Sequence, residues 1–519
     1  MAPPLDVVLE DSVVRAVYLL YAGERGLRED APETLVQFCC WLIVSGRHDI
    51  AHPIVIARAV IVALTTPDTS GTHALMSFVA RAQSHPPPPA KLPGFYYTRA
   101  VPALRLAPFL GPGDFANLPS FGTDSRNNDP DELTFIRELA SGPMRADCPS
   151  VSIIGFHRSV LGLGEDARSM FRALISAGIS AELIDVSPPS LESSEEIEPY
   201  KPFEASRPSG EALIFCMPPF EMMRTIANLA LEAGRSRQYR IGYWAWETTS
   251  LRSDWLLAAD HVDEIWAMSH FLKGVYESQC GTKPVIYMPP HIDEPSCRIP
   301  GDLAPMFSGG FSFLSIFDFN SRIERKNPLG LIRAFKAAFP DGAEPVRLVL
   351  KTLNQEKHPE QFAEVMSSIG ADERIILIDG PLHQSDLNGL ISLADAYVSL
   401  HRSEGFGRTM AEAMRLGVPV IGTGWSGPAD YLDETTGYPI DSIKIPVADH
   451  QYPFAAGEWA DPDLDQAASA FRSVVDNWEQ ASGRSERANA RISQLYSRHA
   501  VANLLRARLL QIGTQIEAS

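Results

Sequence analysis

Two tandem sets of short apolar segments, each alternating with helical segments, constrain the fold of this 519-residue chain most strongly. The first set begins at residue 151 with VSIIGF, followed by an amphipathic segment at 165–177 and by AELIDV. The apolar segments are continuous rather than alternating in polarity, which is typical of parallel strands covered by helices on both faces. We therefore predict an α/β protein with two Rossmann-like lobes that face one another across a cleft.

The remaining strands and helices are expected at definite positions. In the first set, further strands are expected at 212–216, 240–244, 264–268 and 285–288. In the second set, strands are expected at 311–317, 346–351, 374–378, 396–400 and 419–423. Helices of the second set are expected at 328–339, 359–369, 385–394 and 409–416.

The chain before residue 149 has a different character. Residues 1–85 predict a helical N-terminal extension, because their apolar residues recur at helical spacing. Four prolines at 86–89 interrupt regular structure, and the Pro-, Gly- and Asn-rich stretch 86–148 predicts an irregular linker. We assign the two lobes to 149–300 and 301–490.

Composition excludes several classes of function. The chain carries 64 Asp and Glu against 45 Lys and Arg, a net charge of −19, and has no dense basic run, so we expect no nucleic-acid partner. Its six cysteines form no metal-ligand pattern and fit a reducing compartment. An acidic N-terminus and the lack of about 20 consecutive apolar residues argue against a signal peptide or a membrane span. We expect a cytoplasmic protein, and leave open peripheral contact with the inner face of the membrane.

The strongest motif follows the strand expected at 396–400. A loop with Gly405 and Gly407 leads into a helix, so it lies at the carboxyl end of a parallel strand, where open α/β sheets bind ligands. The helix N-terminus favours negative charge there. Glu404 in the loop and Glu412 in the helix can each accept hydrogen bonds from a diol. By itself the spacing of two glutamates is a weak signal, because a dipole-stabilising acid and a solvated helix residue would produce it too.

Together with its flanking residues, this motif resembles the donor motif of the retaining glycosyltransferases of family four, which have the GT-B fold. The matching residues are Glu404-Gly-Phe-Gly, Glu412-Ala-Met and Gly417-Val-Pro-Val. Segments elsewhere match the same family in order, especially its bacterial polysaccharide-synthesis branch. These segments are Gly162-Leu-Gly164-Glu-Asp-Ala-Arg, Val285-Ile-Tyr-Met-Pro-Pro-His-Ile-Asp and Phe317-Asp-Phe-Asn-Ser-Arg-Ile-Glu-Arg-Lys-Asn-Pro. The resemblance covers about residues 150 to 500.

The resemblance implies roles for individual residues. Glu404 would contact the donor sugar and Glu412 the ribose, while the backbone amides of Gly405, Phe406 and Gly407 would meet the sugar and the diphosphate. Gly162 and Gly164 would form the glycine-rich first loop of the first lobe, and residues 491–519 would form a helix that returns to that lobe.

A basic cluster of Arg322, Arg325 and Lys326 is expected to hold the donor diphosphate. Breaking the C1–O bond leaves negative charge on the departing phosphate, and cations placed there stabilise the transition state more than the ground state. The family usually carries an Arg several residues before the Lys, and Asn320 occupies that position here. Arg322 or Arg325 is the expected substitute. The alternative, a solvated basic helix start, is less favoured because cations oppose the dipole at that end.

The implied activity is transfer, with retention, of a hexose-type sugar from a nucleoside-diphosphate sugar to a glycan or lipid-linked acceptor. The resemblance implies no metal and no separate cofactor, and implies that the leaving phosphate helps to take the acceptor's proton. Family members often carry a His near the reacting centre on the first lobe. Here the corresponding segment ends at Glu247 without one. Glu247 or a backbone group is the alternative, while His157 and His401 are candidates by position alone.

Two other functions stay open at this stage. Gly162 and Gly164 with Ala167 also fit the dinucleotide fingerprint, with Asp185 as ribose ligand, which would indicate an NAD-dependent oxidoreductase. Five residues separate the strand from Gly162, which argues against that fingerprint. A GT-B protein that has lost catalysis and serves as a binding or scaffold protein is the non-enzymatic alternative, and retention of Glu404 and Lys326 favours the enzyme.

Overall fold

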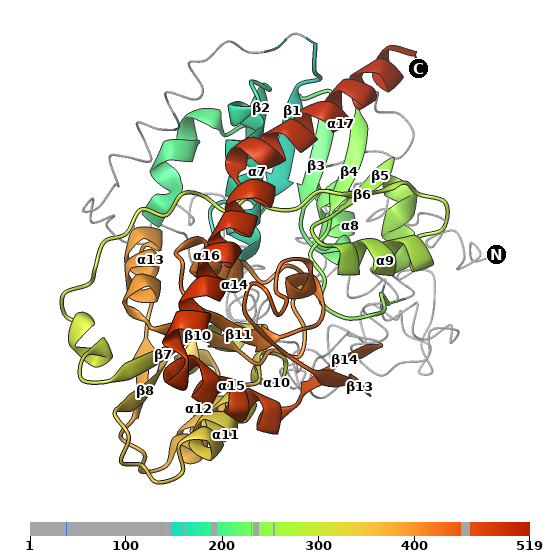
Figure 1. Cartoon of the computed structure of the whole chain (residues 1–519). Helices are drawn as coiled ribbons and strands as arrows, with labels where there is room; N and C mark the ends of the chain where they lie inside the picture. The colour runs from blue at the N-terminus through green and yellow to red at the C-terminus, as the bar shows by residue number, and fades with distance from the viewer. Residues whose placement is uncertain are drawn as a thin grey trace, which may run out of the picture.

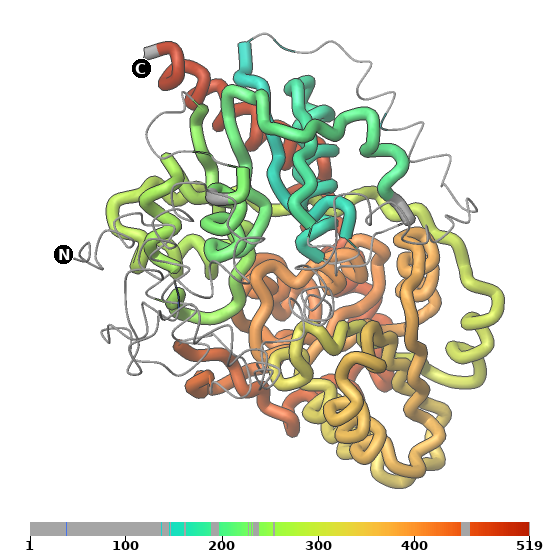
Figure 2. Tube along the Cα trace, turned by 180° about the vertical axis from the view of Figure 1, so that it is seen from behind, coloured from blue at the N-terminus to red at the C-terminus, as the bar shows by residue number. Residues whose placement is uncertain are grey.

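The computed structural model describes residues 145–518, except 146, 160–161, 188–194, 230, 232–237, 253–254 and 448–456, together with Phe38 and Ile136. The predicted helical extension at 1–85 and nearly all of the linker at 86–148 therefore lie outside the described residues. The described chain forms two lobes, one above the other in Figures 1 and 2.

The first lobe is built on a six-stranded parallel sheet in the order β2–β1–β3–β4–β5–β6. Its strands are β1 (Val151–Gly155), β2 (Ala181–Asp185), β3 (Ala212–Cys216), β4 (Tyr239–Tyr243), β5 (Glu264–Ala267) and β6 (Val285–Tyr287). Every residue of β1 and β3 is buried, as expected for central strands with helices on both faces. The helical segments of this lobe are α7 (Gly162–Ser176), η4 (Glu195–Phe203), α8 (Pro219–Asn228), η5 (Trp255–His261) and α9 (His270–Gln279).

The second lobe repeats this plan with the sheet order β12–β11–β10–β7–β8–β9, again all parallel. Its strands are β7 (Phe311–Asp318), β8 (Val346–Leu353), β9 (Ile375–Asp379), β10 (Ala396–Ser399), β11 (Val420–Thr423) and β12 (Tyr438–Ile440). Its helices are η6 (Ala304–Phe307), η7 (Phe319–Ser321), α10 (Ile323–Lys326), α11 (Pro328–Ala338), η8 (Gln355–Lys357), α12 (Pro359–Ile369), α13 (Gln384–Leu393), α14 (Arg408–Arg415) and η9 (Gly427–Asp430). The predicted α/β fold with two Rossmann-like lobes is confirmed.

The C-terminal part joins the two lobes. An antiparallel hairpin of β13 (Ser442–Pro446) and β14 (Glu458–Pro462) precedes three helices. These are α15 (Leu464–Asp476), α16 (Trp478–Leu495) and α17 (Arg498–Ala518). Figure 1 shows α16 and α17, in red, running from the lower lobe across to the upper one. There the Arg508 guanidinium of α17 forms an ion pair with Glu264 of β5, so the last helix lies on the first lobe.

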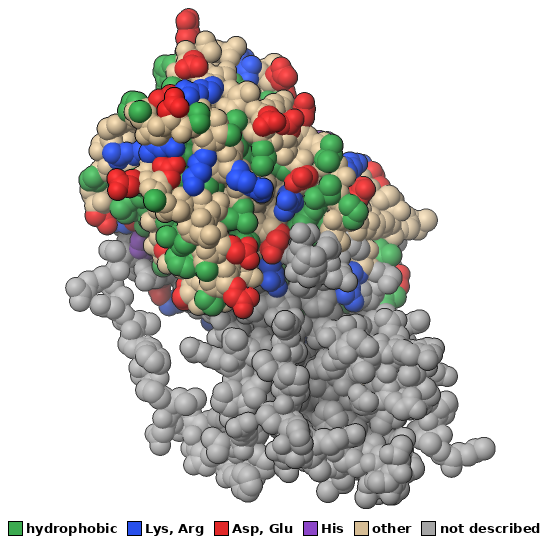
Figure 3. Space-filling view, turned by 90° about the horizontal axis from the view of Figure 1, so that it is seen from below, with side chains coloured by type: hydrophobic (Ala, Val, Ile, Leu, Met, Phe, Trp, Pro, Cys, Tyr) green, Lys and Arg blue, Asp and Glu red, His purple; other side chains and the backbone are tan. Residues whose placement is uncertain are grey.

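The described surface is of mixed charge on the face seen from below, where acidic and basic side chains are interspersed (Figure 3). Within the described part of the chain, none of the helices combines the length and the apolar character needed to cross a bilayer.

Candidate functional site

The sheet topology of the second lobe brings two loops together. Strands β7 and β10 are neighbours, yet the chain continues from β7 to β8 on one side and from β10 to β11 on the other. The loops after β7 and β10 therefore diverge at a topological switch point, which is where open α/β sheets bind ligands. One loop carries Lys326 and the other Glu404.

The short helix α10 is fixed against the loop after β10. Positive φ angles at Arg322 (66°) and Asn327 (55°) bracket this helix and turn the chain sharply at both of its ends. The Asn327 Nδ2 donates to the Leu400 carbonyl (2.9 Å), and the Arg402 amide donates to the Arg325 carbonyl (2.7 Å). The basic residues of α10 thus take up a defined position beside the strand end at β10.

Glu404 lies between two of these cations. Its Oε1 is 2.5 Å from the Lys326 Nζ, and its Oε2 is 3.3 Å from the Arg325 Nη1. Burial would raise the pKa of the Glu404 carboxyl, but the charges of Lys326 and Arg325 outweigh burial and lower that pKa to about 2. The carboxylate is therefore ionised at any working pH, and the two cations share a single negative charge from their own lobe.

The glycines of the loop allow close approach of backbone to backbone. Gly407 has a φ of 86°, and a Cβ there would lie 2.6 Å from the Tyr431 hydroxyl, which donates to the Phe406 and Gly407 carbonyls. At Gly405 a Cβ would lie 2.7 Å from the Trp246 carbonyl of the first lobe. Only glycine fits at either position without a shift of its neighbours.

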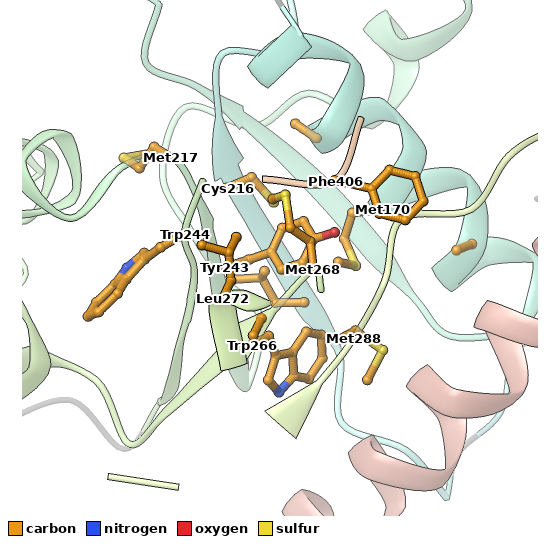
Figure 4. Close-up of a cluster of buried hydrophobic side chains, with 14 of the residues drawn as sticks. Met170, Cys216, Met217, Tyr243, Trp244, Trp266, Met268, Leu272, Met288 and Phe406 are labelled. Carbon is orange, nitrogen blue, oxygen red and sulfur yellow. The ribbon is translucent and has the colours of Figure 1, made fainter. Parts of the chain in front are cut away.

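Phe406, between these glycines, is buried in the core of the opposite lobe. It belongs to the same hydrophobic cluster as Met170, Tyr243 and Met268. Figure 4 shows the Phe406 ring beside Met170, among side chains of the first lobe. Its aromatic ring is therefore part of the packing between the lobes. The implied role of its backbone amide, contact with the donor, stays a prediction.

Glu412 lies on α14, near charged groups of the first lobe. Burial and the negative charges of Glu165 and Asp293 raise the pKa of the Glu412 carboxyl to about 7, although Arg408 opposes them. Arg408 itself donates to Asp166 of α7 (2.8 Å) and to the His291 carbonyl (3.3 Å). The second glutamate of the motif thus lies at the boundary between the lobes, and its implied role as a ribose ligand stays a prediction.

The remaining predicted residues are placed as follows. Gly164 lies at the start of α7, where a Cβ would be 2.3 Å from the Ser159 carbonyl, whereas Gly162 has open space around its Cα. The charge of Arg322 acts on Glu324 and His358. Arg325 and Lys326, rather than Arg322, are therefore brought to Glu404.

Neither of the two histidines that were candidates by position, His157 and His401, is placed to accept a proton beside Glu404. The His157 Nε2 is 2.8 Å from Glu204 of the first lobe. His401 is fully buried with its Nδ1 3.2 Å from Ser399, and burial lowers its pKa to about 4.

Asn320, where the family usually has Arg, lies 2.8 Å from the His358 Nε2 through its Oδ1. Glu247 was a candidate from the sequence, but its contact with Arg325 and the contact of Arg408 with Asp166 had no sequence signal, since both depend on how the lobes pack.

The family model matches part of the second lobe, whereas the solved structures match a larger part of the chain. Residues 316–444 match the family model described as glycosyl transferases group 1. The comparison with curated proteins finds no match. Sucrose-phosphate synthase from Thermosynechococcus elongatus has a similar structure at 14% identity, with a TM-score of 0.53, over 70% of this chain and 99% of that one. HepE from Anabaena, in complex with UDP-glucose, matches over the same shares at 13% identity and a TM-score of 0.50.

TarM from S. aureus matches over 58% of this chain at 13% identity and a TM-score of 0.44, and this chain spans 55% of the length of TarM. At these identities the matches to sucrose-phosphate synthase and HepE establish the fold alone, which is GT-B, and the family model supports the predicted relationship for the matched residues. The chain therefore has the GT-B fold, and residues 316–444 of its second lobe match the model of the glycosyl transferases group 1 family.

Proposed function

We propose that this chain is a retaining glycosyltransferase that moves a hexose-type sugar from a nucleoside-diphosphate sugar to a glycan or lipid-linked acceptor. The observation that carries this proposal is that Lys326 and Arg325 both form ion pairs with Glu404 at the topological switch point of the second lobe. A carboxylate that can accept hydrogen bonds from sugar hydroxyls lies beside two cations that suit a diphosphate.

Each group then has a distinct task. Lys326 and Arg325 bind the diphosphate and stabilise the negative charge that grows on it as the C1–O bond breaks. Glu404 orients the sugar, and Glu412 holds the ribose. The acceptor hydroxyl attacks C1 from the face that the diphosphate leaves, so configuration is retained. The cations supply the charge that a metal supplies in other transferases, and the reaction is proposed to be independent of metal.

Lys326 forms an ion pair with Glu404, so a bound donor must replace each of these side chains as the partner of the other. The diphosphate takes over Lys326 while the hydroxyls of the sugar take over Glu404. Removing the carboxylate would take away negative charge beside Lys326 and Arg325, which raises affinity for a bare diphosphate but loses the orientation of the sugar. Donor binding and turnover should therefore respond differently to substitution of Glu404.

UDP-glucose is the first donor to test, since a structurally similar protein, HepE, is in complex with it. We would measure thermal stabilisation by a panel of nucleoside-diphosphate sugars, followed by transfer to glycan and lipid-linked acceptors. A donor at 100 times its Kd should stabilise the protein by about 2.7 kcal/mol. Stabilisation without any transfer or donor hydrolysis would favour the scaffold alternative, and no stabilisation by any member of the panel would contradict the donor site.

A further inference from the structure

One carboxylate of the first lobe lies at the Glu404 cluster. The Glu247 Oε1 is 3.9 Å from the Arg325 Nη2, while the other terminal nitrogen of that guanidinium is 3.3 Å from Glu404. A single planar guanidinium thus has a carboxylate of each lobe near it. About a quarter of the Glu247 side chain (23%) is exposed, whereas Arg325 is almost fully covered.

The backbone around Glu247 is held from several sides. The Ser403 hydroxyl, one residue before Glu404, donates to the Glu247 carbonyl. The Trp246 indole donates to the Ser250 carbonyl (3.0 Å). On the far side, the amide of Thr249 donates to the Glu458 carbonyl of β14 (3.3 Å). The carboxylate therefore projects from a fixed segment, as a group that must meet a reacting atom requires.

We propose that Glu247 is the general base that accepts the proton of the acceptor hydroxyl, an inference that rests on the proposed function. Glu404 and the cations place the donor sugar and its diphosphate on the second lobe, so an acceptor must reach C1 from the first lobe. Glu247 is the carboxylate that the first lobe brings to the same guanidinium. His157 is bound to Glu204 and His401 is fully buried, so neither competes for this task.

The step balances as follows. The acceptor oxygen forms a bond to C1 while the C1–O bond to the diphosphate breaks, and the electron pair of that bond stays on the diphosphate oxygen. The acceptor's proton moves to a Glu247 carboxylate oxygen and is lost to solvent after the products leave. This route differs from the one implied by the family resemblance, in which the leaving phosphate takes the proton.

The test is Glu247→Gln in the full chain, which keeps size and hydrogen bonding but removes the basic oxygen. We expect kcat with a hydroxyl acceptor to fall by about 10²- to 10⁴-fold, the usual contribution of general-base catalysis. Donor Kd should stay within about twofold, because no proton moves on binding. Azide, a nucleophile that carries no proton, should be glycosylated by this variant at about the wild-type rate.

Three results would overturn the inference. Unchanged kcat with the hydroxyl acceptor would remove any catalytic role for Glu247. A parallel loss with azide and with the hydroxyl acceptor would show that Glu247 acts only by positioning Arg325. A wild-type protein that binds no sugar nucleotide would remove the proposed function along with the inference. Glu294→Gln is the matched control, because Glu294 is 87% exposed and pairs with Arg415, so it should behave as wild type.

Discussion

The two lobes use equivalent positions in their sheets in opposite ways. In the second lobe, Lys326 and Arg325 share one carboxylate of their own lobe, Glu404, beside a glycine loop. In the first lobe, acids and bases around α7 satisfy one another: Glu165 pairs with both Arg168 and Arg172, and Arg172 pairs in addition with Asp293. An excess of cations favours an anionic ligand, whereas a balanced network favours packing. We therefore expect the donor to bind to the second lobe, and the network of the first lobe to contribute mainly to packing.

The balanced network also reaches across the boundary. Arg408 of the second lobe pairs with Asp166 of the first, next to Glu165. Burial would raise the pKa of Glu165, but Arg172 and Arg168 lower it to about 2, so Glu165 is ionised at working pH. We therefore expect substitutions of Lys326 or Arg325 to lower the rate of transfer most strongly. Substitutions in the ion-pair network of the first lobe should mainly alter the free energy of unfolding.

The largest effect is expected for Lys326→Ala. Loss of a cation aimed at the leaving diphosphate should lower kcat by about 10²- to 10³-fold, by analogy with loss of one oxyanion donor. Steady-state transfer with the donor identified by stabilisation measures it. Lys357→Ala is the control, since Lys357 is a partly exposed lysine of the same lobe whose charge lies near Glu356. A Lys326→Ala enzyme with wild-type kcat would contradict the role of the cation excess.

The next effect is expected for Arg408→Ala, which leaves Asp166 without its partner between the lobes. Removing one partner of a covered ion pair should cost about 2–4 kcal/mol of unfolding free energy, somewhat less than for a fully buried pair. Urea unfolding measures this cost. Adding Asp166→Asn should recover part of it, because the stranded charge is then gone. Strictly additive losses in the double variant would show that the two side chains are not coupled.

A smaller effect should follow from Glu412→Gln, and it depends on pH. The folded pKa of Glu412, about 7, lies above the usual unfolded value of about 4.3, so the folded protein holds this proton more tightly. Stability from this group is present at low pH and is lost as pH rises through that window, by about 2.5 kcal/mol between pH 5 and pH 8. Urea unfolding at pH 5 and pH 8 should therefore show a smaller pH-dependent loss for Glu412→Gln than for wild type. An identical loss in both proteins would contradict the assignment.

The smallest effect is expected from metal removal. Because Lys326 and Arg325 supply positive charge at the diphosphate, transfer after treatment with EDTA should stay within about twofold of the untreated rate. Transfer assays with and without added Mg²⁺ measure this. A large loss that Mg²⁺ restores would show that the cations do not suffice.

Much of the fold could be predicted from the sequence, because strand and helix patterns are local. The strands expected at 212–216 and 346–351, for instance, are present as β3 and β8, the latter extended by two residues. The pairing of the loops that carry Lys326 and Glu404 also followed from pattern, since both loops end parallel strands. The hairpin of β13 and β14 was not predicted, because its strands are short and β13 is largely exposed.

The lobe boundary could not be predicted. Glu247 lies beside Arg325, and Asp166 pairs with Arg408, only because the two lobes pack against one another, and no local spacing encodes that geometry. The sequence pattern does not distinguish Arg322 from Arg325 as the arginine that accompanies Lys326 at the expected diphosphate site. The positive φ at Arg322 decides the turn of the chain, and Arg325 is the residue that reaches Glu404.

The central claim is that Lys326 and Glu404 form the donor site, and calorimetric titration with a nucleoside diphosphate and its sugar tests it most directly. Wild type should bind both. Glu404→Ala should bind the diphosphate more tightly than wild type and lose at least about tenfold in affinity for the sugar nucleotide, whereas Lys326→Ala should lose affinity for both. Unchanged binding of both ligands to both variants would contradict the claim.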